Sequence, residues 1–255
     1  MSLLNELLNT ASLDELKLQQ GDRVLDVGSG LGQFSRAMAR VVKPMGYVLG
    51  IERDSQQLTE AIREAQDDGE KSLVEFRQGD ALKLPLRDEE LRNFDVVHAR
   101  FLLEHLRCPL DAVLEMTKAV RASGRIVLMD DDHANFHLYP EPTGFYSLWN
   151  AYIRSYDRLG NDPYIGRRLV SLLFKAGAKH IRNTCIFFGG CSGQPTFHSL
   201  VDNMIGVLEG SRETMISEKL IDEESFNEAI DNLKKWKVHD SAALWYPVCW
   251  AEGKW

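Results

Sequence analysis

The sequence predicts an α/β protein with a mostly parallel sheet and helices on both of its faces. Short apolar runs alternate with segments of helical periodicity over residues 23–129, and the linkers between them are short. This alternation is typical of parallel strands joined by crossover helices. The runs are almost continuously apolar, as expected for strands that are covered on both faces.

Five strands are expected in the first half of the chain. They are the runs RVLDV, YVLGI, LVEF, FDVVHA and GRIVLM, at 23–27, 47–51, 73–76, 94–99 and 124–129. The helix after the first run carries apolar residues with helical spacing, namely Phe34, Ala37, Met38 and Val41. Ser55 is expected to cap the next helix, which extends to about Gln66. The helix before the fifth run carries on one side Leu110, Val113, Leu114 and Thr117.

The pattern changes after residue 130. An aromatic-rich loop spans 130–146, and the helix after it carries on one face Trp149, Tyr152, Ile153 and Tyr156. Asp162 and Pro163 begin another helix, the run TCIFF predicts a sixth strand at 184–188, and LWYPVCWAEG predicts a last strand at 244–253. We expect a single domain over 1–255 with an N-terminal helix over 1–18. Two insertions, 132–165 and 196–235, are expected to cover a shared site as lids.

Composition narrows the classes of partner. The chain has 30 Lys and Arg against 38 Asp and Glu, a formal net charge of -8, so a small or neutral partner is favoured over nucleic acid. No run approaches the ~18–20 consecutive apolar residues that span a bilayer, so we expect no integral membrane segment. The four cysteines are scattered without a CxxC pair. This indicates a reducing compartment, the cytoplasm, and argues against a disulfide framework.

The stretch with the clearest chemical meaning follows the first strand. Asp26 is followed by glycines at every second position, Gly28, Gly30 and Gly32, and then a helix begins. Glycine allows unusual backbone dihedrals and close approach of a ligand, and a helix N-terminus offers unpaired N–H groups. A dinucleotide fingerprint would place its third glycine one residue later, where Gln33 stands. A glycine-rich turn without a ligand is the alternative interpretation.

Two further acids end the next two strands. A carboxylate accepts hydrogen bonds through both oxygens, so Glu52 can bind the two hydroxyls of a ribose. Asp80, in Gly79-Asp80-Ala81, can accept from an exocyclic amine such as that of adenine. The carboxyl ends of consecutive strands meet at the ligand crevice of an open α/β sheet. We therefore expect Asp26, Glu52 and Asp80 to share one site with the glycines.

At these residues the sequence resembles the class I S-adenosylmethionine-dependent methyltransferases. The resemblance runs through Val24–Gly32, Glu52, Gly79-Asp80-Ala81, Phe94–Leu106 and Gly124–Asp131. It implies a Rossmann-like seven-stranded sheet, with an antiparallel last strand inserted between the sixth strand and the fourth and fifth. HARFLLEHL and NDPYIGRRLVSLLFKAGA are similar to small-molecule methyltransferases of the ubiquinone/menaquinone-biosynthesis kind (type 11/25).

The resemblance implies S-adenosylmethionine as cofactor and S-adenosylhomocysteine as product. The methionyl part of the cofactor would be lined by Gly28, Ser29, Gly30 and Gly32, and Asp26 would hold the amino group of the cofactor through water. Glu52 would bind the ribose. Gly79, Asp80 and the Ala81 backbone would read adenine, on which Arg53 could stack. Ala99, Arg100 and His105 would flank the methyl-donor end of the cofactor.

The acceptor side is less defined. His105, which stands close to the expected methyl, and His133 are candidate catalytic bases, although either could simply pack in the fold. We expect Glu104 to be a solvated charge on a helix. A solvated loop is favoured over a metal site for the run Asp130, Asp131, Asp132 and His133, so we expect no metal. An apolar acceptor pocket could be walled by six aromatic residues, Phe136, Tyr139, Phe145, Tyr146, Trp149 and Tyr152.

Three functions are therefore compared. The favoured one is methyl transfer by direct displacement to a small, partly apolar or aromatic molecule. A protein that binds the cofactor without transferring methyl, as a sensor or scaffold, is the second. An NAD-dependent oxidoreductase is the third, and the glycine spacing argues against it. The sequence names neither the acceptor nor the oligomeric state.

Overall fold

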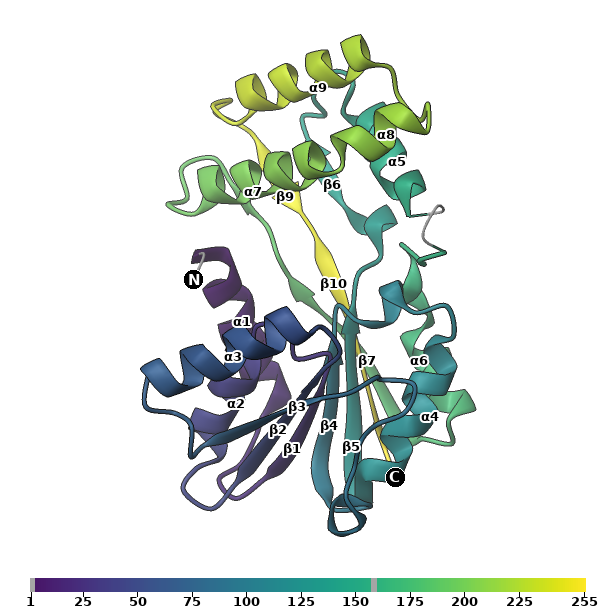
Figure 1. Cartoon of the computed structure of the whole chain (residues 1–255). Coiled ribbons are helices and arrows are strands. Elements are labelled where there is room, and N and C mark those ends of the chain that lie inside the picture. Colours follow the sequence, from purple (N-terminus) through teal and green to yellow (C-terminus); the bar gives the residue numbers. More distant parts are fainter. Residues whose placement is uncertain (1–2, 157–159) are drawn as a thin grey trace.

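The computed structural model describes residues 3–156 and 160–255, with side chains from residue 8 on (Figure 1). Its centre is a seven-stranded sheet in the order β3-β2-β1-β4-β5-β10-β7. The strands are β1 (Arg23–Val27), β2 (Tyr47–Glu52), β3 (Val74–Gln78), β4 (Phe94–Arg100), β5 (Val120–Asp130), β7 (Lys179–Phe187) and β10 (Pro247–Lys254). All five strands expected in the first half and the sixth are confirmed. The expected last strand, 244–253, is divided at Tyr246: its greater part is β10, and its start belongs to β9 (Ala243–Trp245) in a second sheet.

The pairing of these strands is that of the predicted Rossmann-like sheet. β1 pairs in parallel with β2 and β4, β2 with β3, and β4 with β5. β10 is antiparallel to both of its neighbours, β5 and β7, so the last strand lies inside the sheet. The insertion of an antiparallel strand at this place is confirmed.

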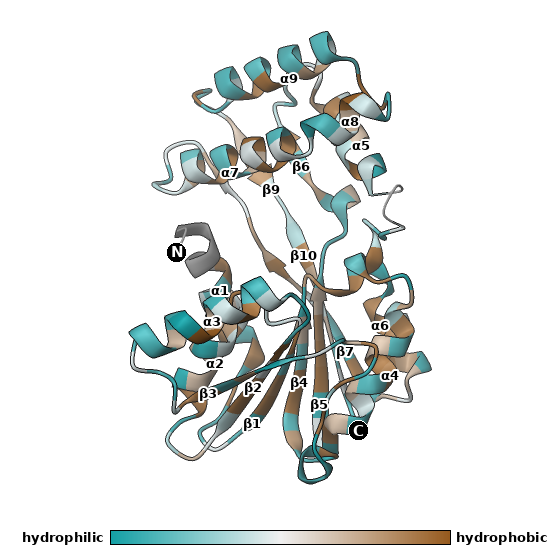
Figure 2. Cartoon of the chain, viewed as in Figure 1, coloured by the Kyte–Doolittle hydropathy of each residue, from teal (hydrophilic) through white to brown (hydrophobic). Residues whose placement is uncertain are grey.

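Helices cover both faces of the sheet. One face carries α1 (Leu3–Leu16), α2 (Gln33–Val42) and α3 (Ser55–Asp67), and the other carries α4 (Pro109–Ala119) and α6 (Leu169–Lys175). Side chains at alternating positions of each strand point to opposite faces of the sheet. Val24 therefore packs in the core beneath the first group of helices, and Leu25 in the core beneath the second. Figure 2 shows apolar residues along the strands and polar residues on the outer surfaces of the helices. Among the described helices, none combines the length and the apolar character needed to cross a bilayer.

The two expected insertions form a second layer above the carboxyl ends of the strands (Figure 1). It contains α5 (Phe145–Ser155), α7 (Phe197–Gly210), α8 (Arg212–Ser217) and α9 (Glu223–Trp236), and α5 contacts both α8 and α9. A three-stranded sheet joins β6 (His137–Tyr139), β9 (Ala243–Trp245) and β8 (Gly190–Cys191). β6, β8 and α8 were not predicted, because such short elements carry little periodicity. Residues 157–159 of the first insertion lie outside the described residues.

Three local expectations are wrong. The cap of α3 is Asp54 rather than Ser55, because its carboxylate accepts hydrogen bonds from the N–H groups of Gln56 and Gln57. Val41 and Leu114 are exposed. In both helices the buried stripe is rotated by about one residue, and Val42 and Ala112 face the core in their place.

Candidate active site

The glycine loop joins β1 to α2 and lies against the end of β2. The N–H groups of Gly28 and Ser29 both donate to the carbonyl of Ile51, at 2.8 and 3.0 Å. All three loop glycines have positive φ angles, and at Gly32 φ is 72°. A Cβ at Gly32 would lie 2.4 Å from the Phe76 ring, so the position requires glycine for space as well as for conformation.

Glu52 connects this loop to the end of β2. Its Oε2 accepts from the N–H of Gly30 at 2.8 Å, and its Oε1 accepts from the N–H of Asp54 at 2.8 Å. The Glu52 carbonyl accepts from the N–H of Gly79 at 3.0 Å, which brings the end of β3 beside it. The carboxylate is therefore oriented by two backbone donors at the edge of the glycine loop.

An open cleft of about 700 Å³ lies at this edge of the sheet. Of the predicted cofactor residues it is lined by Gly28, Gly30, Glu52, Arg53, Arg100 and His105. Asp54, Ser55, Gln57 and Phe101 complete the lining. The structure thus brings together groups from the ends of β1, β2 and β4 and from the start of α3.

Other predicted residues stand behind or beside the cleft rather than on its surface: Asp26, Ser29, Gly32, Gly79, Asp80, Ala81 and Ala99. Asp26 is buried, and its oxygens accept from the Ser35 hydroxyl at 2.5 Å and contact His98 Nδ1 at 2.8 Å. Burial opposes ionisation of Asp26, but the interactions with His98, Ser35 and Arg100 outweigh it and lower its pKa. Asp80 accepts from the N–H of Leu82 at 2.8 Å. The cofactor roles of these residues stay predictions.

Arg100 is the more deeply buried of the two arginines that line the cleft. Its guanidinium lies 4.1 Å from the centre of the Phe34 ring and donates to Asn9 Oδ1 at 2.8 Å. Burial lowers the pKa of Arg100 to about 10, although the charge of Asp26 opposes the change. Among the described residues, no hydrogen-bond acceptor meets its buried Nη1. The guanidinium is therefore available to an anionic group in the cleft.

A second cavity, of about 230 Å³, lies between the main sheet and the upper layer. Its walls come from α1, α5, α7, β9, β10 and the segments after β4, β5 and β7, and most of them are apolar or aromatic. Of the six aromatic residues expected to wall an acceptor pocket, Phe136, Trp149 and Tyr152 line it. Phe145 is buried behind them, whereas Tyr139 and Tyr146 are exposed. Phe101 lines both this cavity and the cleft, and so separates the two.

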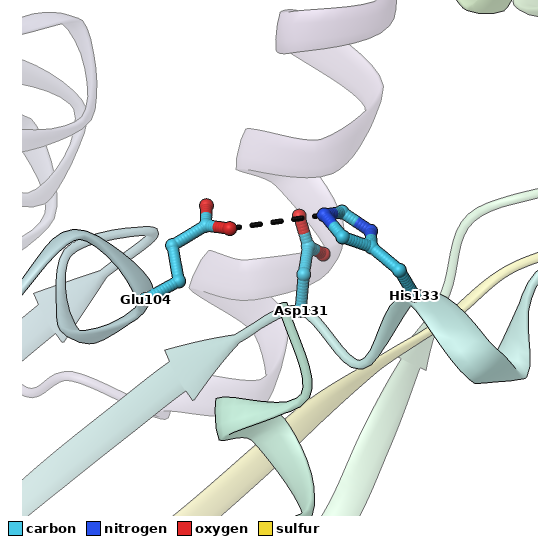
Figure 3. Close-up of side chains that lie close together, drawn as sticks. All are labelled: Glu104, Asp131 and His133. Carbon is cyan, nitrogen blue, oxygen red and sulfur yellow. Dashed lines mark ion pairs between the residues drawn. The ribbon is translucent and has the colours of Figure 1, made fainter. Parts of the chain in front are cut away.

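A group of polar side chains meets this cavity. Figure 3 shows Glu104 and His133 pointing toward one another with Asp131 between them. Glu104 comes from η2 (Leu103–His105), Asp131 follows β5, and His133 begins η3 (His133–Asn135). His133 Nε2 lies 3.7 Å from Glu104 Oε2, and Asp131 and His133 line the cavity. Distant parts of the chain thus assemble one cluster.

The interior environment changes the protonation of this cluster. Burial, with the charges of Asp131 and Asp130, raises the pKa of Glu104 to about 9. Burial raises the pKa of Asp130 to about 8 and that of Asp131 to about 7. Burial also lowers the pKa of His133 to about 4, so its imidazole is neutral near pH 7.

The expectations of solvated charges in this region are wrong. Glu104 is only 4% exposed, because its short 3₁₀ turn is covered by the insertion that follows β5. Asp130 is buried and accepts from the N–H groups of Leu102 and Leu103. Asp132 is buried, caps η3 and forms a two-point ion pair with Arg167 at 2.7 Å.

The two predicted catalytic histidines lie in different places. His105 lines the cleft, is about half exposed, and its Nε2 lies 3.5 Å from Glu104 Oε1. Burial lowers the pKa of His105. His133 is buried beside the second cavity. Their roles as bases stay predictions.

Comparison with known proteins identifies the family to which this fold and site belong. A family model described as a methyltransferase domain matches residues 18–151, which include the glycine loop, the cleft residues and the cluster after β5. The chain belongs to the methyltransferase-domain family. The predicted resemblance to the class I methyltransferases of small-molecule type is confirmed at this level.

Relatives of this methyltransferase-domain protein agree with the assignment. The chain is 30% identical over 130 residues to a ubiquinone/menaquinone biosynthesis C-methyltransferase of Stutzerimonas stutzeri, covering 51% of this chain and 50% of that protein. It spans about half the length of the first curated relatives that it matches.

Two solved structures share the fold. One is a putative methyltransferase from Bacillus halodurans, 22% identical, with a TM-score of 0.58 over 99% of both chains. The other is the [4+2]-cyclase SpnF, 19% identical, with a TM-score of 0.57 over 97% of this chain and 81% of that one. At these identities the likeness extends to the fold alone.

Several residues of the cleft and the second cavity were not predicted. Phe101 lies within HARFLLEHL and Tyr246 within the predicted last strand, but neither pattern, nor that of α7, marks these residues as parts of a cavity wall. Phe101 has a positive φ of 51°, which a bulky residue adopts rarely and mainly at functional sites. Nothing in a single sequence reveals that angle.

Proposed function

We propose that this chain is an S-adenosylmethionine-dependent methyltransferase that acts on a small, partly apolar or aromatic molecule by direct displacement. The observation that carries the proposal is the apolar cavity that adjoins the glycine-loop cleft across the single side chain of Phe101. A cofactor in the cleft and an acceptor in the cavity would meet at this side chain. Its expected place in the cytoplasm rests on the scattered cysteines.

The residues of the cleft fit the cofactor. Arg100, whose Nη1 lacks an acceptor in the described part of the chain, would bind the carboxylate of the methionyl group. Glu52, already oriented by two backbone donors, would accept from the ribose hydroxyls. Gly28 and Gly30 would allow close approach of the backbone, and Asp80 with the Ala81 backbone would read adenine. When bound, the cofactor supplies an activated methyl group.

The second cavity fits an acceptor of limited size. Its walls are mainly apolar and aromatic, and polar groups come from Asp131, His133, Asn203 and the hydroxyls of Tyr152 and Tyr246. Such a cavity excludes water and orients a small molecule by few polar contacts. Alignment of acceptor and methyl group without water supplies much of the rate of a displacement.

Binding without transfer is the second candidate. The cyclase among the structural neighbours illustrates that this fold alone does not specify methyl transfer. A binder needs no space beyond the cofactor, whereas here a cavity of about 230 Å³ is present beside it. The family match leaves no support for the NAD-dependent oxidoreductase.

Calorimetric titration with S-adenosylmethionine, S-adenosylhomocysteine and NADH tests the cofactor. We expect binding of the first two and none of NADH. Glu52→Ala and Asp80→Ala should each weaken binding by ~1–3 kcal/mol, because each leaves a ligand donor without its acceptor. Binding of neither sulfur compound to the folded protein, or unchanged affinity in both variants, would overturn the cofactor assignment.

Transfer is tested with methyl-labelled cofactor and a panel of small phenols, quinols and amines. Label in any acceptor supports the enzyme. Tight cofactor binding without transfer to any member of the panel would favour the binder.

A further inference from the structure

We propose that Glu104, Asp131 and His133 form a site for a divalent transition-metal ion such as Zn²⁺, beside the acceptor cavity. The site goes beyond the proposed methyl transfer and does not depend on it. Its three donors come from separate segments, η2, the residue after β5 and the start of η3, and converge in Figure 3.

The spacing of the donor atoms is that of ligands around one ion. One oxygen of Glu104, one oxygen of Asp131 and one imidazole nitrogen of His133 all lie within 4.8 Å of one another. The 3.7 Å between Glu104 Oε2 and His133 Nε2 is too long for a hydrogen bond. Two ligands that each lie ~2.1 Å from a shared ion stand ~3–4 Å apart. The atoms are thus spaced for a common partner rather than for each other.

Two of these donor oxygens are buried and lack a well-formed hydrogen bond, although the hydroxyls of Tyr156 and Tyr246 act on the Glu104 and Asp131 carboxyls. Glu104 is 4% exposed, and neither its Oε2 nor Asp131 Oδ1 has a hydrogen-bond partner among the described residues. Buried oxygens are almost always satisfied, so each exception needs an explanation, of which a bound ion is one.

Neighbouring acids differ in this respect. Asp130 accepts from two backbone N–H groups, and Asp132 is paired with Arg167. Arg167 is therefore already engaged by another carboxylate. Among the described carboxylates, the buried oxygens without a hydrogen-bond partner belong to the two acids that face His133, so a cation would bind between them.

The surroundings of His133 support metal ligation. The Tyr246 hydroxyl lies 2.7 Å from His133 Nδ1 and so directs Nε2 toward Glu104. The Tyr156 hydroxyl, 3.1 Å from Nε2, would yield this position to an ion. Tyr156 would keep a partner, because its hydroxyl also lies 3.0 Å from that of Tyr152.

The donor set selects the kind of ion. Two carboxylates and one imidazole suit a borderline ion such as Zn²⁺ better than Mg²⁺, which prefers oxygen ligands and retains water. Three protein ligands leave a coordination position open. Since Asp131 and His133 line the second cavity, that position would face the acceptor.

The test is calorimetric titration of chelator-treated protein with Zn²⁺, with Co²⁺ absorption as a second readout that reports nitrogen and oxygen ligation. We expect one ion per chain in the unmodified protein. Loss of a residue that only hydrogen-bonds to a metal ligand typically weakens metal affinity ~10–100-fold, and loss of a ligand itself weakens it more. Glu104→Gln, Asp131→Asn and His133→Gln should therefore each weaken Zn²⁺ affinity at least ~100-fold. Tyr246→Phe should weaken it within the ~10–100-fold range.

His137→Gln is the matched control, because it removes an exposed imidazole on β6 outside the cluster and should leave Zn²⁺ affinity unchanged. S-adenosylhomocysteine binding and a cooperative thermal transition check that each variant folds. No Zn²⁺ binding, several weak sites, or equal affinity in the control and the cluster variants would overturn the metal site. Mg²⁺ binding in preference to Zn²⁺ would overturn the choice of ion. None of these outcomes bears on the cofactor titration, which is done without metal.

Discussion

The carboxylate of Asp26 is a buried charge near the end of β1, two residues before the first glycine of the loop. It contacts His98 on the adjacent strand β4 and Ser35 on α2. It therefore connects three elements at the base of the cleft. Because its native pKa lies below the ordinary value of 3.8, ionisation of Asp26 favours the folded state.

Asp26→Asn should lower the free energy of unfolding at pH 7 by ~1–3 kcal/mol, since it weakens two hydrogen bonds to a charged acceptor. A depressed native pKa gives stability that is complete above the unfolded pKa and is lost as the pH falls through the native one. The difference between variant and parent in urea melts should therefore shrink below about pH 4. A difference that persists unchanged at lower pH would contradict this account. Ser35→Ala, which removes one bond and keeps the charge, should have a smaller effect.

Gly32 and Gly21 separate two effects of glycine. Both have positive φ, but a Cβ at Gly32 would strike Phe76, whereas nothing lies within 4 Å of one at Gly21. Gly21→Ala should lower stability by ~1 kcal/mol through backbone strain alone, and Gly32→Ala by more, measured by urea denaturation. Equal losses would mean that Phe76 moves aside without resistance.

At the scale of elements, Arg36 joins α2 to α3 and the turn that follows it. Its guanidinium is buried and pairs with Glu64 at 2.8 Å, Glu70 at 2.6 Å and Asp68. Hydrogen bonds and charges of these acids outweigh the effect of burial and raise the pKa of Arg36. The apolar face of α2 thus includes one cation that the sequence pattern did not single out.

Arg36→Leu should lower the free energy of unfolding by ~2–3 kcal/mol, because the largely buried carboxylate of Glu70 then loses part of the positive charge that compensates it. Arg63→Leu removes an exposed arginine from ion pairs on the surface of α3 and should have no measurable effect. Urea melts of both variants at low and high salt check the contrast. Equal effects would show that burial of Arg36 is unimportant.

The elements differ in how well the sequence predicts them. β1 and the start of β4 were predicted to the residue, because buried parallel strands are continuous apolar runs with sharp ends. The phase of α2 and α4 was wrong by about one residue, since their neighbours decide which side of an amphipathic helix is buried. β6 and β8 depend on pairing with β9, which follows β8 by more than fifty residues and β6 by more than a hundred. A local sequence pattern does not encode pairing over such distances.

At the scale of the molecule, cleft and cavity are built from different parts of the chain. The cleft residues lie within Gly28–His105 and carry motifs, so the sequence indicated many of them. The cavity unites α1, α5, α7 and β10, which pack together only in the finished fold. The burial of Glu104 also depends on the finished fold, because Tyr156 and His133, which come from the insertion after β5, pack beside its side chain.

Met204→Trp should separate the two compartments. Met204 lies on α7 in the wall of the cavity, and a larger ring would fill the space for the acceptor. We expect S-adenosylhomocysteine affinity to stay unchanged while methyl transfer is lost, measured by calorimetry and with labelled cofactor. Weakened cofactor affinity in a folded variant would show that cleft and cavity are not independent.

The place of β10 inside the sheet has a consequence for synthesis on the ribosome. β7 is translated roughly 60 residues before β10, which at ~5–20 residues per second is an interval of ~3–12 s. During that time β5 and β7 have no strand between them, and both edges can pair with other chains. The nascent protein should therefore need a chaperone most in this interval, and synonymous codons that slow translation between Phe187 and Pro247 should lower its soluble yield.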